Sequence, residues 1–194
     1  MLRRIISFFG AFGLFCGIAN AEPISYPPDA EVRRETEVPM QSSQLTALDE
    51  FLSRPDYFGA FAVAGDGAYG WFSRANDIET ARDYALTYCE SYQPVGSEFT
   101  CIVVATTVPR GFDGPGNGTL RHKAGADLWA LKTDRRFAGA RALAASGSGA
   151  YGFVYNRPSS AGAERDALQI CEQYNSKTDV ILPRSQCKVL WVSR

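Results

Sequence analysis

Two stretches of the chain share one pattern of glycine, aromatic, alanine and apolar positions. Residues 67–90 read GAYGWFSRANDIETARDYALTYCE, and residues 149–172 read GAYGFVYNRPSSAGAERDALQICE. They align without a gap at an offset of 82, and nine of the twenty-four positions are identical. Unrelated segments of ordinary composition would share roughly one or two positions. The pattern therefore indicates an internal duplication and predicts the same local structure in both places.

A β-hairpin is expected at the start of each copy. In the first, apolar runs flank Asp66-Gly67, a pair typical of a two-residue turn with positive φ at both positions. In the second, Gly147 and Gly149 lie between two similar runs. The hairpin-turn residues predicted by this pattern are Asp66, Gly67, Gly70, Gly147, Gly149 and Gly152.

An amphipathic helix follows each hairpin, because alanine and apolar residues recur there at helical spacing. Asn76 and Glu79 form a possible capping box for the first helix, and Ser159 or Ser160 would cap the second. A cysteine then opens an apolar run that predicts a strand. The predicted fold class is α+β, with two tandem ββαβ repeats, a mainly antiparallel sheet and one disulfide-tethered helix per repeat.

The pattern outside the two copies sets the expected domain boundaries. A short helical pattern with Leu45, Leu48 and Leu52 precedes the first hairpin, and a fainter echo occurs at Leu128. The stretch before it mixes charges with prolines and has no period, which is typical of disorder. The expected boundaries are a signal peptide at 1–21, a disordered linker at 22–41 and an exported α+β domain at 42–194, divided into repeat 1 (about 42–109), a connecting loop (110–127) and repeat 2 (about 128–194).

The first twenty-one residues have the order of a secretory signal. Arg3 and Arg4 precede an apolar core, and Ala19-Asn20-Ala21 forms a small-x-small cleavage site. The apolar run is short for a transmembrane span, although an uncleaved anchor is the alternative interpretation. The prediction is a periplasmic or secreted protein with no stable membrane span after cleavage.

Export changes how the cysteines are interpreted. Cys16 would leave with the signal, and the four that remain allow three disulfide connectivities. Cys89 and Cys171 occupy equivalent places at the ends of the helices, and Cys101 and Cys187 each follow at a short distance. The duplication therefore favours Cys89 with Cys101 and Cys171 with Cys187, each worth roughly 3 kcal/mol. Four metal ligands are the alternative, but neither pair has CxxC spacing.

Charge and motifs exclude several functions and support no cofactor. The net charge of −1 argues against a nucleic-acid surface. Residues 65–70 and 147–152 both match GxGxxG, but strand-favouring aromatics follow where a dinucleotide site needs a helix. His122 is the single histidine and lies in a basic segment, where a solvated role is expected. The stretch from Asp113 resembles a calcium loop but has Pro115 at a ligand position.

The combination of an alanine-rich strand, a GxYG hairpin, an AxxxALxxC helix and a cysteine-initiated strand resembles small exported bacterial domains of unknown function. The resemblance covers about 58–105 and 138–192, implies a fold and a compartment, and carries no catalytic residues. A pyridoxal-phosphate-dependent aminolevulinate synthase activity is not supported, because such an enzyme needs a larger domain and a Schiff-base lysine. The four lysines in no recognisable cofactor setting are Lys123, Lys132, Lys177 and Lys188.

The leading hypothesis is an exported, disulfide-stabilised binding or interaction module for an unknown protein or small-molecule partner. The alternative is a small exported enzyme such as a hydrolase that uses carboxylates or His122, although no GxSxG nucleophile pattern is present. The predicted places for a ligand are a groove between the halves and the loop at 109–127. What the copies share is expected to be scaffold, so function is expected where they differ, as at Arg74 against Asn156.

Overall fold

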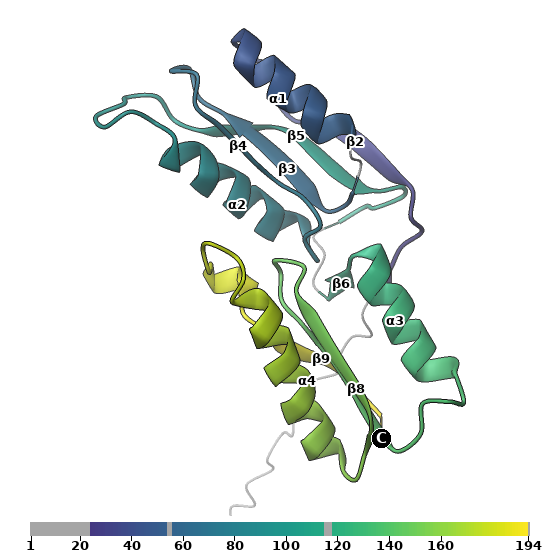
Figure 1. The fold of residues 1–194 in the computed structure, drawn as a ribbon. Coiled ribbons are helices and arrows are strands. Elements are labelled where there is room, and N and C mark those ends of the chain that lie inside the picture. Colours follow the sequence, from purple (N-terminus) through teal and green to yellow (C-terminus); the bar gives the residue numbers. More distant parts are fainter. Residues whose placement is uncertain (1–23, 54–55, 115–117, 194) are drawn as a thin grey trace, which may run out of the picture.

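The computed structural model describes residues 24–53, 56–114 and 118–193 (Figure 1). The predicted signal peptide, residues 1–21, lies outside the described residues. Across the described ranges, no helix is long and apolar enough to cross a membrane. The elements up to residue 109 are β1 (Ile24–Ser25), β2 (Ala30–Arg34), α1 (Ser42–Ser53), β3 (Gly59–Val63), β4 (Tyr69–Phe72), α2 (Ile78–Ser91) and β5 (Ile102–Pro109). Those that follow are β6 (Thr119–Leu120), α3 (His122–Thr133), β7 (Ala140–Ala145), β8 (Tyr151–Arg157), α4 (Ser160–Asn175), a 3₁₀ turn (Pro183–Ser185) and β9 (Lys188–Val192).

The two halves have the same order of elements: helix, strand, strand, helix, strand. Their sheets are separate, with strand order β2-β5-β3-β4 in the first half and β8-β7-β9 in the second. Every pair within these two sheets is antiparallel, which confirms the predicted class of α+β with mainly antiparallel pairing. In Figure 1 the β7–β8 hairpin points from the second half towards the N-terminal end of α2.

The repeating unit is one helix longer than the predicted ββαβ, and α3 occupies part of the predicted connecting loop at 110–127. α3 buries Ala124, Leu128 and Leu131 against Leu143 of the second sheet. The helix begins at His122 without a side-chain cap. The sequence therefore lacks the usual signal for a helix start at this position. For that reason the predicted connecting loop, 110–127, includes the first residues of α3.

The predicted disordered linker at 22–41 also contains structure, which corrects that prediction. β2 pairs with the edge of β5 from Ala30 opposite Pro109 to Arg34 opposite Ala105. Strand addition at an edge uses backbone hydrogen bonds, so it needs no apolar period in the added segment. The charged sequence of β2 is therefore compatible with its place in the sheet.

Each sheet lies between two helices. In the first half, Ala60 and Ala62 of β3 face Ala81 and Ala85 of α2, where four small side chains allow close approach. The opposite face carries larger side chains, among them Phe61, which packs with α1. The second half repeats this arrangement with α4 on its alanine face and α3 on its other face. The duplicated alanines are therefore packing positions.

The hairpin corners differ from the predicted two-residue type. Gly67 and Gly149 have positive φ values of 98° and 92°, whereas Asp66 is not in the left-handed region. The Ala64 N–H donates to Ala68 O at 2.9 Å, and the Gly67 N–H donates to Ala64 O at 3.1 Å. These bonds enclose a three-residue loop whose last residue is left-handed, a common alternative hairpin geometry.

Gly70 and Gly152 lie in β4 and β8, not in the turns where the pattern placed them. A Cβ built on Gly70 would lie 2.3 Å from the backbone nitrogen of Cys89, and one on Gly152 would lie 2.6 Å from Ala167 O. Real Cβ contacts are essentially never that short. These two glycines are therefore required where the strand touches its helix, and they set the separation between the two elements.

The structure contains the disulfides Cys89–Cys101 and Cys171–Cys187, the two pairs that the duplication favours. Each ties the C-terminal part of a helix to the start of the following strand region. The pairing is consistent with an exported domain in an oxidising, extracytoplasmic compartment. The capping prediction is half correct: Ser159 caps α4, but the N-cap of α2 is Asp77 rather than Asn76.

Candidate functional site

Asn76 joins the two halves of the molecule through its amide and its backbone. Its side-chain NH₂ donates to Ser146 O at 2.8 Å, and its side-chain oxygen accepts from the Arg121 N–H at 3.0 Å. Its backbone N–H donates to Gly147 O at 2.9 Å, and its carbonyl accepts from the Thr119 hydroxyl. Only 3% of Asn76 is exposed, so every one of these polar groups needs a partner.

Gln44 of α1 makes the matching contact inside the first half. Its NH₂ group donates to Ala64 O and Ala68 O, both at 2.9 Å. The equivalent carbonyls at the second corner, Ser146 and Ala150, face the NH₂ group of Asn76. Each hairpin corner is thus capped by a carboxamide, which comes from α1 in one half and from the other half in the second. Because Asn76 of the first half takes this place at the corner of the second half, the two repeats are joined end to end.

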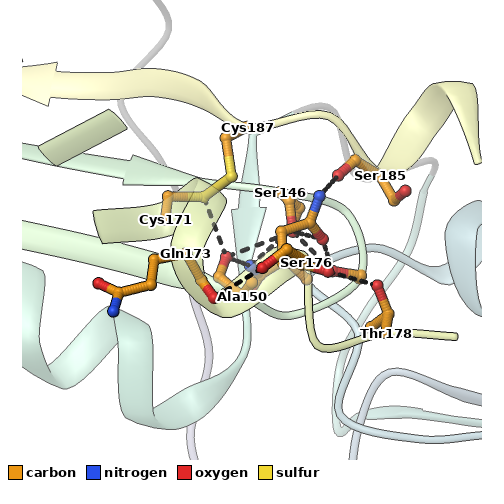
Figure 2. Close-up of a disulfide and its surroundings, with 11 residues drawn as sticks. Ser146, Ala150, Cys171, Gln173, Ser176, Thr178, Ser185 and Cys187 are labelled. Atoms are coloured by element: carbon orange, nitrogen blue, oxygen red, sulfur yellow. Dashed lines mark hydrogen bonds between the residues drawn. A yellow bond between two sulfur atoms is a disulfide. The ribbon is translucent and has the colours of Figure 1, made fainter. Parts of the chain in front are cut away.

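A second carboxamide links each corner to the disulfide region. The Asn175 side chain accepts from Ser148 Oγ at 2.6 Å and donates to Ser185 O at 2.7 Å. Figure 2 shows Ser146, Ser185 and the Cys171–Cys187 disulfide within this network. In the first half Gln93 takes the corresponding place, donating to Phe99 O at 2.7 Å. Because such polar contacts occur at both corners, they belong to the shared scaffold.

The end-to-end contact leaves a basic pocket of about 310 Å³ beside it. We call it the junction pocket. Its lining comes from both halves: Pro28, Asp56, Tyr57, Arg74, Arg121, His122 and Lys123. Three of these side chains carry a permanent positive charge and a fourth is a histidine, whereas Asp56 is the one carboxylate among the described lining residues. Such a set favours an anion.

Arg74 lies at the rim of the junction pocket in an unfavourable backbone conformation. Its φ is 67°, and the equivalent residue, Asn156, has a φ of 55°. The left-handed geometry is therefore a requirement of the shared fold at this position. Asparagine adopts it more readily than arginine does. Arg74 Nε lies 2.8 Å from Asp56 Oδ2, and both side chains are substantially exposed.

Arg121 and Lys123 both lie over the ring of Tyr151, which is not itself among the lining residues of the junction pocket. The Arg121 guanidinium carbon lies 5.4 Å from the ring centroid, and Lys123 Nζ lies 6.0 Å from it. The Tyr151 hydroxyl donates to Asp127 Oδ2 at 2.6 Å. The pKa of Lys123 is raised, mainly by a hydrogen bond with Tyr151 and then by the nearby charges of Tyr151 and Asp127. Arg121 Nε is buried without a hydrogen-bond partner among the described residues.

The N-terminus of α3 adds to the positive field. No side chain caps it, and His122 and Lys123 are its first two residues. Unpaired N–H groups at a helix start act as a partial positive charge of about half a unit. His122, for which the basic segment predicted a solvated role, is exposed at this helix start and lines the junction pocket.

A second hollow of about 420 Å³ also lies between the halves, around Asn76 and Gly147. Its charged lining is mixed, with Asp77 and Glu79 opposite Arg184 and Lys188. Asp77 is already occupied, since its carboxylate accepts from the Thr80 N–H at 2.7 Å. This hollow therefore has no net preference for a charged ligand, unlike the junction pocket.

The junction pocket lies between the halves and draws three basic residues from the stretch at 109–127. The predicted disulfide and hairpin residues line none of it. Sequence reasoning missed the role of Asn76, because its partners are backbone groups far away in the chain. The described residues hold no group of three or more His, Cys, Asp and Glu side chains that could bind a metal ion.

Comparison of this chain with protein-family models, curated proteins and solved structures gave no match.

Proposed function

We propose that this protein is an exported, disulfide-stabilised binding module that holds a small anionic ligand in the junction pocket. The observation that carries the proposal is the convergence of Arg74, Arg121, His122 and Lys123 on one hollow in which Asp56 is the single carboxylate of the described lining. The chain as a whole has a net charge of −1, so this local excess of positive charge is not a property of the general surface.

The size and chemistry of the pocket define the ligand class. A volume of about 310 Å³ is at the lower end of the range for small-molecule sites. Guanidinium groups bind carboxylate and phosphate in pairs of hydrogen bonds, and a lysine adds a point charge. The ligand is therefore a phosphorylated or polycarboxylate small molecule.

Titration calorimetry with pyrophosphate as the probe tests the proposal. We expect binding at one site per chain, and an affinity that falls as sodium chloride is raised, because salt screens exposed charges. Lys123→Gln should weaken binding about tenfold, since a hydrogen bond to a charged group contributes about 1.5–3 kcal/mol.

Lys177→Gln is the matched control, because Lys177 is an exposed lysine outside the pocket lining. Equal affinities for the two variants, or no binding by the wild-type chain, would reject the junction pocket as an anion site.

A small hydrolase acting through His122 is the alternative. The candidate nucleophile in the pocket lining is Tyr57, whose hydroxyl donates to Tyr26 O at 2.9 Å. Burial raises the pKa of Tyr57 to about 12, which disfavours its reactive anion. We therefore favour binding over hydrolysis. Generic ester and phosphate substrates that the wild-type chain turned over, and His122→Ala did not, would reverse that preference.

A further inference from the structure

Each half has a groove along the open edge of its sheet. The first edge groove, about 690 Å³, is lined by residues 66–71, Tyr88 of α2, the C-cap residue Tyr92, Gln41, Pro94 and Asp179. The second edge groove, about 620 Å³, includes residues 148–153, Ile170 and Tyr174 of α4, and Arg121, Lys123 and Asp127. The strand and helix positions correspond at the offset of the duplication. One geometry therefore occurs twice with different side chains.

The strand in each groove is the last in its sheet. β4 pairs only with β3, and β8 pairs only with β7, among the strands described. On an edge strand, alternate backbone N–H and C=O groups point away from the sheet and are free to pair with another chain. Gly70 and Gly152 place no side chain between this edge and the helix beside it.

An exposed aromatic side chain lies at the C-terminal end of the helix beside each strand. Tyr92 is 72% exposed and Tyr174 is 55% exposed, one helical turn after Tyr88 and Ile170. An open strand edge next to exposed aromatic side chains is the arrangement with which proteins bind extended peptides: the backbone supplies pairing and the flanking pockets accept side chains.

The charges distinguish the two grooves. The first contains Asp66 and Asp179, and no basic residue is among its described lining residues. Asp66 accepts hydrogen bonds from the Ser97 hydroxyl at 2.5 Å and the Ala68 N–H at 3.0 Å, which fix its carboxylate. Asp179 is exposed, and no ion pair of the described residues involves it. The second groove instead holds two cations beside Asp127.

We infer that the first edge groove binds an extended cationic peptide, which adds to β4 as a further strand. Backbone pairing with β4 would align the peptide, aromatic contact with Tyr88 and Tyr92 would hold its alternate apolar side chains, and Asp66 and Asp179 would attract its lysines or arginines. The inference rests on the sheet edge and is independent of the anion site at the junction.

Fluorescence anisotropy tests this with a labelled peptide of alternating lysine and valine. We expect one peptide per chain, with affinity lowered about tenfold by Tyr92→Ala. The matched control is Tyr174→Ala, the same change at the equivalent position of the second groove, and it should leave binding unchanged. Asp179→Asn should weaken binding, whereas Asp49→Asn, an exposed change on α1, should not.

Three further outcomes would overturn the inference. A peptide with N-methyl groups at alternate positions cannot complete the strand pairing, so equal binding of that peptide would rule out strand addition. Equal binding of a glutamate–valine peptide would rule out the charge assignment. Oligomers of the chain alone that Tyr92→Ala dissociates would show that the groove is occupied by a second copy. Arg74→Asn should change none of these results, which separates them from the junction pocket.

Discussion

Four carboxamide side chains hold the two hairpin corners at the scale of single residues. Gln44 and Asn76 donate to the corner carbonyls, while Gln93 and Asn175 connect the corners to the disulfide regions. Gln93 and Asn175 are equivalent in the duplication but not identical. The identical positions of the two copies therefore include the cysteines and glycines of the scaffold but not the carboxamide side chains that make hydrogen bonds at the corners.

Asp66 makes one corner sensitive to acid. Hydrogen bonds from Ser97 and from the Ala68 N–H lower the pKa of the Asp66 carboxyl below its usual 3.8. A lowered folded-state pKa adds stability that is complete above the unfolded value and is lost as the pH falls through the folded value. Thermal melts between pH 5 and pH 2 should show wild type more stable than Asp66→Asn at pH 5, with the difference shrinking towards pH 2.

Ser148 occupies the equivalent place in the second corner and does not titrate, so Ser148→Ala is the control for this pH dependence. Its melting temperature should differ from that of wild type by the same amount at both ends of the pH range. A difference for Asp66→Asn that stayed constant with pH would contradict the role given to the carboxylate.

At the scale of elements, Gly70 and Gly152 determine how closely strand and helix pack. The Cβ added by Gly70→Ala would clash with the backbone at Cys89, which cannot move freely because it is disulfide-bonded. We expect a loss of about 1–3 kcal/mol in the free energy of unfolding, as is typical of overpacked sites. Urea denaturation measures this.

Gly114→Ala provides the comparison, because a Cβ at Gly114 has no atom within 4 Å. Its free energy of unfolding should lie within about 0.5 kcal/mol of the wild-type value. Equal effects of the two substitutions would mean that Gly70 is not a contact glycine.

The order of strands and helices could be predicted where the chain repeats its own pattern and at α1, where Leu45, Leu48 and Leu52 recur at helical spacing. The shared glycines, alanines and cysteines predict the hairpin, helix and closing strand of each half. β2 has a charged sequence without a strand pattern of its own. Its position depends on pairing with the edge of β5, which cannot be read from the local sequence. α3 starts at Arg121-His122 without a capping side chain, so its first turn gives no signal.

At the scale of the whole molecule, the two halves meet through a contact that exists once. The NH₂ group of Asn76 takes the place at the second corner that Gln44 of α1 takes at the first. The junction pocket forms beside this contact, and among its lining residues Arg74 has a different residue, Asn156, at the equivalent place in the other half. The sequence pointed to the space between the halves or to 109–127, and the junction pocket has lining residues from both, but the convergence of its side chains depends on tertiary structure.

Asn76→Ala should weaken the contact between the halves. The substitution leaves the Arg121 N–H without its partner and removes one of the two hydrogen bonds to the Ser146 carbonyl, which keeps the one from the Gly149 N–H, at a cost of about 1–3 kcal/mol. Hydrogen exchange followed by mass spectrometry should show faster exchange over residues 118–126. Gln44→Ala removes the matching bonds within one half and should leave exchange in that segment unchanged, whereas the same acceleration in both variants would contradict a specific role for Asn76.

The most direct test of the anion site replaces Arg74 with the residue that the second half carries there. Asparagine adopts the left-handed backbone at lower cost than arginine, by about 1 kcal/mol. Arg74→Asn should therefore leave the melting temperature unchanged or raise it. Calorimetry on the same sample should show affinity for pyrophosphate reduced about tenfold, with Arg135→Asn, an exposed loop arginine, as the unaffected control. Unchanged affinity in Arg74→Asn would contradict the account, because function would then not lie where the two copies differ.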